Sequence, residues 1–118
     1  MRIFVAVAVL AIGVSSPATG QVSLDEKCRL VSVIAYATMF GRQTGRSLVE
    51  SLEFAEGPFR DLVFAAYSEP RHEGLTEQNL AAERFRDDAA MACYSGEIDV
   101  PDSLFDAAER DASGPTDD

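Results

Sequence analysis

The segment 24–44, LDEKCRLVSVIAYATMFGRQT, is the sequence feature that most constrains the fold of this chain. A helix over these residues would be apolar on almost every side, with Cys28 near its start and Arg42 and Gln43 at its solvent-exposed end. A helix that is apolar on nearly all sides is buried by other parts of a protein. We therefore expect this helix to lie at the centre of the fold, with the other segments packed around it.

Helix start and stop signals divide the following residues into three more helices. Ser47 and Glu50 have the spacing of a capping box, as Ser23 and Glu26 do before the first helix. No stretch alternates between apolar and polar residues, so no sheet is expected. The expected helices cover 24–44, 48–55 and 77–94, with a third between the first pair and the last that begins at Pro58 and is ended by Pro70. The second starts at Leu48, and Thr76 caps the fourth.

The first twenty residues have the pattern of a secretory signal peptide. Arg2 precedes an apolar run over 3–14, and small residues with a proline follow over 15–20. We expect cleavage before Gln21, with cleavage after Ala18 as the alternative. A transmembrane anchor is another interpretation, but the run is short of the roughly 20 apolar residues that a membrane span needs. The sequence thus predicts an exported protein, periplasmic or secreted, with no stable membrane anchor after cleavage.

The chain has two cysteines, Cys28 and Cys93. In an exported protein an even number of cysteines favours a disulfide, and two cysteines allow one pairing. Two buried free thiols are the alternative. The bond would join the start of the first helix to the end of the fourth, so these two helices should run antiparallel. The predicted fold class is all-α: a small bundle of four helices, linked by one disulfide and followed by an acidic, flexible C-terminal tail.

Acidic residues outnumber basic ones by 20 to 10, and the excess is concentrated near the C-terminus. Residues 97–118 hold eight Asp or Glu and one Arg. This balance argues against a nucleic-acid partner, because affinity for phosphates comes from Lys and Arg. We expect a signal peptide over 1–20, a helical domain over 21–96 and an acidic tail over 97–118, with one short helix over 101–110 before a disordered end.

Signatures of catalysis are sparse in this sequence. The one histidine, His72, lies between Arg71 and Glu73 in a polar loop, where we expect it to be solvated. Nucleophile triads and zinc sites usually need a histidine with partners at set spacings, and a bonded cysteine pair leaves no thiol. The sequence predicts no catalytic residue, no metal site and no cofactor. A small hydrolase built on Glu50 or Glu53 is the alternative.

Six residues at the ends of two helices form a cluster that suggests contact with a partner. Arginine and tyrosine are enriched among the residues that contribute most to binding at protein interfaces. In the alternative interpretation the tyrosine belongs to the core with its hydroxyl at the edge, and the arginines bond the carboxyl ends of helices. The candidate contact rim consists of Arg42, Gln43 and Arg46 at the end of the first helix, and Tyr67, Pro70 and Arg71 at the end of the third.

Several pieces of the sequence together resemble a protein family. They are Cys28 at the start of the first helix, GRQTG at 41–45, VFAAYSEPR at 63–71, and a closing helix with Ala82, Phe85, Asp88, Ala89 and Cys93. Over residues 28–94 the chain resembles short exported proteins of unknown function from proteobacteria and their phages. The resemblance implies an all-helical, disulfide-linked domain, and it transfers no catalytic residue.

These observations predict a small exported protein that acts by contact with another protein of the envelope or the extracellular space. One alternative is an acid-stress periplasmic chaperone, since protonation of 20 acidic residues would change the charge sharply. The other alternative is a small ligand-binding domain or enzyme with a pocket between helices, in which Tyr67, His72 and a carboxylate would meet.

Overall fold

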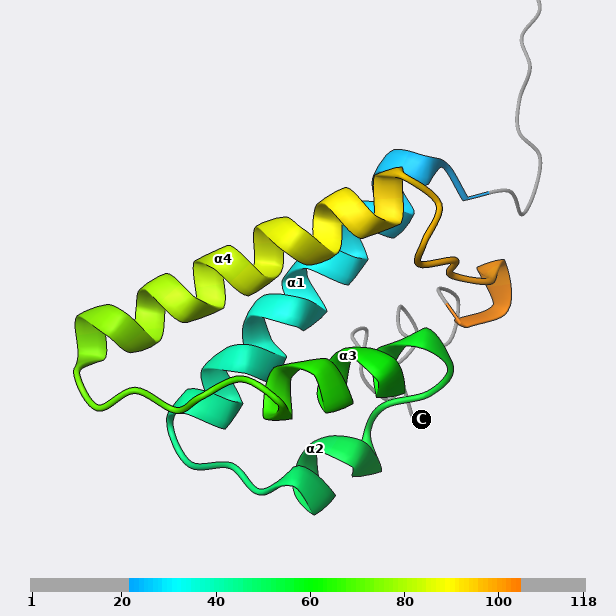
Figure 1. The fold of residues 1–118 in the computed structure, drawn as a ribbon. Helices are drawn as coiled ribbons and strands as arrows, with labels where there is room; N and C mark the ends of the chain where they lie inside the picture. Colours follow the sequence, from blue (N-terminus) through cyan, green and yellow to red (C-terminus); the bar gives the residue numbers. More distant parts are fainter. Residues whose placement is uncertain (1–21, 105–118) are drawn as a thin grey trace, which may run out of the picture.

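A computed structural model describes residues 22–104 of the chain, and this part is all-helical, without a β-strand, as predicted. Its helices are α1 (Leu24–Gln43), α2 (Leu48–Glu53), α3 (Pro58–Tyr67) and α4 (Leu75–Tyr94) (Figure 1). No helix in this range is both long and apolar enough to cross a membrane. The predicted signal peptide and the end of the predicted tail lie outside the described residues.

The two long helices, α1 and α4, run antiparallel and lie side by side (Figure 1). A disulfide joins Cys28 in the second turn of α1 to Cys93 near the end of α4, with the two Cα atoms 5.5 Å apart. Both cysteines are buried. The predicted pairing is therefore confirmed, and it closes a loop between residues 65 apart in the sequence.

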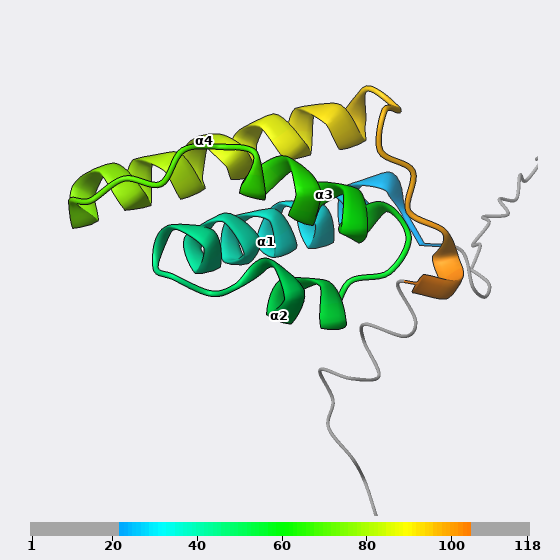
Figure 2. The same cartoon turned by 60° about the horizontal axis from the view of Figure 1, so that its bottom comes forward.

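Helix α1 contacts each of the other three helices, as a central helix should (Figure 2). Val31, Ala35 and Met39 on one face are fully buried. However, Val33 is 59% exposed and Ala37 is also exposed. The expectation that α1 is covered on almost every side is therefore wrong, because α2 has only six residues and leaves this face open.

The helix starts follow local sequence signals in two cases and depart from them in a third. Both predicted capping boxes are present: the hydroxyls of Ser23 and Ser47 each accept a hydrogen bond from a backbone N–H three residues on, at 3.1 Å. Helix α4 instead begins at Leu75 with Gly74 as its N-cap, so the prediction that Thr76 caps it is wrong. Helix α2 ends at Glu53, two residues early, and leaves Phe54 87% exposed.

The segment after α4 belongs to the folded domain. Val100 is 1% exposed and packs in the core beside the disulfide. Lys27 Nζ on α1 lies 2.8 Å from Asp102 Oδ1. At Gly57, where φ is +56°, a Cβ would lie 2.9 Å from Leu104 Cδ1, so the turn before α3 needs a glycine. The domain therefore extends past residue 96, where the sequence had placed the start of the tail.

Candidate functional site

The six residues of the predicted rim do come together, at the place where α1 and α3 end. The guanidinium of Arg42 lies 5.2 Å from the centre of the Tyr67 ring. Its Nη2 also donates a hydrogen bond of 3.0 Å to the carbonyl oxygen of Glu69, just after α3. The end of α3 and the loop that follows are thus held against the end of α1.

Gln43 is the centre of this rim, and it is fully buried. Its Nε2 donates to the Pro70 carbonyl at 2.8 Å, and its Oε1 accepts from the His72 backbone N–H at 2.7 Å. The prediction that Gln43 marks a solvent-exposed helix end is therefore wrong. The loop after α3 folds over α1, and its backbone groups need hydrogen-bond partners once they leave water.

The other rim side chains also bond to the backbone. The Tyr67 hydroxyl donates to the Arg46 carbonyl at 2.6 Å and lies 2.9 Å from Ser51 Oγ. The Nε of Arg71 donates to the Gln43 carbonyl, the last of α1, at 3.0 Å. This geometry is the alternative interpretation from the sequence, with the tyrosine hydroxyl at the edge and an arginine on a helix carboxyl end. The rim can hold two helix ends together, but much of its bonding capacity is already used internally.

The residues considered for catalysis are dispersed. The Glu50 carboxylate caps α2, where its Oε1 accepts from the Ser47 N–H at 3.2 Å. His72 lines a small pocket of about 50 Å³ with Glu69 and Asp88, and Tyr67 is not part of that pocket. Among residues 22–104, no three His, Cys, Asp or Glu side chains are grouped so that they could hold a metal ion.

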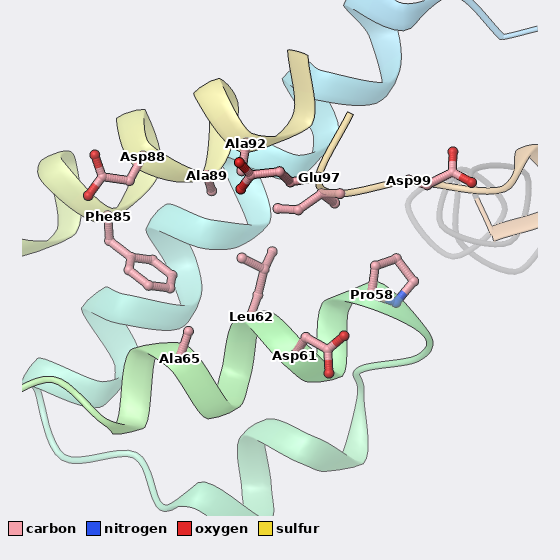
Figure 3. Close-up of a pocket in the computed structure, with 11 residues that line it drawn as sticks. Pro58, Asp61, Leu62, Ala65, Phe85, Asp88, Ala89, Ala92, Glu97 and Asp99 are labelled. Atoms are coloured by element: carbon pink, nitrogen blue, oxygen red, sulfur yellow. The ribbon is translucent and has the colours of Figure 1, made fainter. Parts of the chain in front are cut away.

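A larger pocket lies between α3 and α4, and the segment 97–99 closes one end of it. Its volume is about 550 Å³. Figure 3 shows Leu62 from α3 and Phe85 from α4 reaching into the space between the two helices. The pocket exists because α3 and α4 both pack on α1 and make little contact with each other. We call it the α3–α4 groove, and its apolar lining consists of Pro58, Leu62, Ala65, Phe85, Ala89, Ala92 and Ile98.

The polar lining of the α3–α4 groove is acidic throughout. It consists of Asp61 on α3, Asp88 on α4, and Glu97 and Asp99 on the segment after α4 (Figure 3). Among the residues that the structure describes, no lysine or arginine lines the groove. Within residues 22–104, none of these four carboxylates forms an ion pair with a basic side chain. The groove therefore combines an apolar floor with a negatively charged border.

Sequence reasoning missed this groove. The four carboxylates lie on three elements, so their arrangement around one groove depends on how α3 and α4 sit on α1. One signal was present: Ala89 and Ala92 are small residues near the end of α4, and small side chains leave space beside a neighbouring helix. By contrast, the sequence had placed most of the acidic excess in the tail.

A second apolar surface surrounds Phe54. It includes a smaller pocket of about 210 Å³ where α1, α2 and α3 meet, lined by Ile34, Ala37 and Phe54 among others. Arg46 is also part of its lining, so this surface differs from the α3–α4 groove in charge. It provides a natural comparison for experiments on the groove.

Comparison with protein-family models, with curated proteins and with solved structures finds no match to this chain. The family resemblance seen in the sequence therefore stays a prediction.

Proposed function

We propose that this chain is a small exported domain that acts by binding another protein, and that the α3–α4 groove is the surface that it uses. The observation that carries the proposal is the open apolar floor of a groove of about 550 Å³, within the 83 residues of the range 22–104. Concave apolar surfaces left open on small proteins commonly mark binding sites.

The two walls of the groove are held from opposite ends, which supports this role. Helix α4 is tied to α1 by the disulfide at Cys93. The end of α3 is tied to α1 through the contact of Tyr67 with Arg42 and through the loop bonded to Gln43. A site whose walls are fixed before binding loses less conformational freedom when a partner docks. In this proposal, the predicted rim positions the groove rather than contacting the partner.

The finer predictions about fold and location belong to the same proposal. We propose that the four helices form one bundle, that residues 1–20 direct export and are removed, and that the mature protein is periplasmic or secreted. A buried disulfide supports this proposal, because such bonds form and persist in oxidising compartments.

A groove-filling variant tests the proposal directly. Ala65 is an exposed alanine of the groove, and Ala65→Tyr would occupy the space without adding charge. Ala37→Tyr is the matched control, an exposed alanine beside the Phe54 surface. A partner would be captured from envelope extract with the disulfide-bonded protein, then purified, and its affinity measured for each variant.

We expect Ala65→Tyr to weaken the affinity for the purified partner by about tenfold or more, since a blocked central contact costs at least 1–2 kcal/mol. Ala37→Tyr should leave the affinity unchanged. Equal affinities for the two variants would contradict the proposed use of the groove, and loss of binding in Ala37→Tyr alone would move the site to the Phe54 surface.

A second candidate function is the binding of a small ligand in the same groove. The volume of about 550 Å³ favours it, because it lies within the range of small-molecule sites. A ligand of this kind would raise the melting temperature of the isolated protein in a metabolite screen. A protein partner would instead be recovered as a stoichiometric complex, so the two candidates are separable.

A further inference from the structure

We infer that the α3–α4 groove binds a basic segment of its partner, in which lysine or arginine residues flank one or two large apolar side chains. This inference rests on the proposed function, and it names the chemical class of the partner.

The charge around the groove supports a cationic partner. Asp61, Asp88, Glu97 and Asp99 come from three different elements and surround the same apolar floor. None is neutralised by a lysine or arginine within the described part of the chain. Opposite charge at such a border increases the association rate and favours the correct partner, whereas like charge rejects the wrong one.

The floor of the groove supports an apolar anchor between those charges. Leu62 and Ala89 are buried at the base, and Phe85 is partly buried beside them. Ala65 and Ala92 line the groove with methyl groups, which leave room for a side chain from outside (Figure 3). A large apolar side chain placed there would be removed from water, and this burial favours binding.

Other occupants fit the charge less well. The chain's own residues 105–118 hold five acidic residues and Arg110 alone, so they would meet like charge at the border. A second copy is also acidic overall, with 20 acidic and 10 basic residues. Its arginine-rich rim already uses Arg42 and Arg71 to bond backbone carbonyls. Anionic lipid surfaces and nucleic acids carry the wrong sign.

The inference can be tested with synthetic peptides on the full disulfide-bonded protein. The probe is a short amphipathic peptide of leucine and lysine. One control peptide has glutamate in place of lysine, and another has serine in place of leucine. Binding would be measured by fluorescence anisotropy and located from the amide NMR signals of Ala65, Ala89 and Ala92.

Matched sets of neutralising substitutions identify the charges that matter. The groove set combines Asp61→Asn, Asp88→Asn, Glu97→Gln and Asp99→Asn. The control set combines Glu53→Gln, Glu56→Gln, Glu73→Gln and Glu83→Gln, four exposed carboxylates outside the groove. Both sets change the net charge equally and keep the side-chain shapes, and melting curves would confirm that both variants fold.

We expect the leucine–lysine peptide to bind with a dissociation constant in the micromolar range, about −8 kcal/mol. The groove set should weaken this binding about tenfold or more, and the control set about twofold or less. Neither control peptide should bind measurably. The shifted amide signals should cluster on α3 and α4.

Four results would overturn the inference. Two of them are binding of the glutamate peptide, or of the serine peptide, as strong as that of the leucine–lysine peptide. The third is an equal loss of peptide affinity from the groove set and the control set. The fourth is a shift of amide signals around Phe54 instead of along the groove. A dimer that the groove set dissociates would also overturn it, since a second copy would then be the occupant.

The test separates this inference from the proposed function. If the captured partner is lost by Ala65→Tyr but retained by the groove set, the function stands and the basic class of the partner is wrong. If the partner is retained by Ala65→Tyr, both proposals are wrong.

Discussion

The two ends of the α1–α4 pair are closed by different chemistry. At one end, the start of α1 is bonded covalently to the end of α4 through Cys28 and Cys93, and Val100 packs beside the bond. At the other end, a loop crosses from α3 to α4 and is held by hydrogen bonds to the buried side chain of Gln43. The same pair of helices thus depends on one covalent bond at one end and on a set of polar contacts at the other.

The two closures stabilise the fold by different routes. A disulfide acts largely by restricting the unfolded chain, so its contribution depends on the length of the loop that it closes. A buried polar side chain acts in the folded state, because it satisfies backbone groups that would otherwise lose their hydrogen bonds to water. A reductant should therefore destabilise the end closed by the disulfide. Removal of one hydrogen-bonding group should destabilise the end held by Gln43. The following variants separate the two.

Removal of the disulfide should have the largest effect. For a loop between residues 65 apart, the chain-entropy estimate of its contribution is about 4 kcal/mol. Cys28→Ser with Cys93→Ser, or reduction of the wild type, should therefore lower the melting temperature by roughly 15–30 °C. Thermal unfolding followed by circular dichroism measures this. A shift near zero would mean that the polar end alone determines the stability.

Gln43→Leu should have the next largest effect. It leaves the Pro70 carbonyl and the His72 N–H without partners in a partly buried place, at a cost of about 2 kcal/mol in the free energy of unfolding. Gln78→Leu is the control, since Gln78 makes a single bond of 2.8 Å to the His72 carbonyl at a less buried site. Urea titration of both variants should give the larger loss for Gln43→Leu, and equal losses would show that Gln43 is not the centre of this end.

Tyr67→Phe should have a smaller effect. The ring is kept, but the hydroxyl bonds to the Arg46 carbonyl and to Ser51 are lost, which costs about 1 kcal/mol. The matched control is Tyr36→Phe, because within residues 22–104 the Tyr36 hydroxyl has no hydrogen-bond partner, while its ring stacks on Phe40. The control should unfold at the same urea concentration as the wild type. If both variants lost a similar amount of unfolding free energy, the loss in Tyr67→Phe could not be assigned to its hydroxyl hydrogen bonds.

Tyr94→Phe should have the smallest effect at neutral pH and a visible one in alkali. The Tyr94 hydroxyl donates to Asp25 Oδ1 at 2.9 Å, beside the disulfide. This bond, with smaller contributions from desolvation and the Asp25 charge, raises the pKa of Tyr94 above its usual value of about 10. The stabilisation is therefore complete below that value and is lost as the pH rises through the higher pKa of the folded protein.

The alkaline experiment compares melting temperatures of the wild type and Tyr94→Phe between about pH 8 and about pH 11. The wild type should lose more stability than the variant over the upper part of that range. Parallel curves for the two proteins would contradict the role of this bond. Because Tyr94 is exposed, solvent screening keeps the difference small.

The covalent end could be predicted from the sequence, and the polar end could not. Two cysteines allow one pairing, and the capping boxes at Ser23 and Ser47 are local patterns that need no tertiary information. Gln43 reads as an exposed polar residue, because its partners are 27 and 29 residues away in the sequence and its burial depends on where a loop crosses α1.

The same limit applies to the groove and to the domain boundary. The carboxylates of Asp61 and Asp88 are 27 positions apart in the sequence, and they line the same groove only because α3 and α4 both pack on α1. Val100 is one apolar residue in an acidic segment, so composition assigns it to a tail. Its burial follows from the position of the disulfide, which brings the end of α4 and the following residues to the start of α1.

The pairing of the first and last helices also determines when the protein can fold. Helix α1 is made first, but its buried face, with Val31, Ala35 and Met39, is covered largely by a helix that is made last. Val100 completes the core only after all four helices have been synthesised. The buried face of α1 therefore stays uncovered in the nascent chain until α4 has been made, and exposed apolar surface of this kind is what chaperones bind.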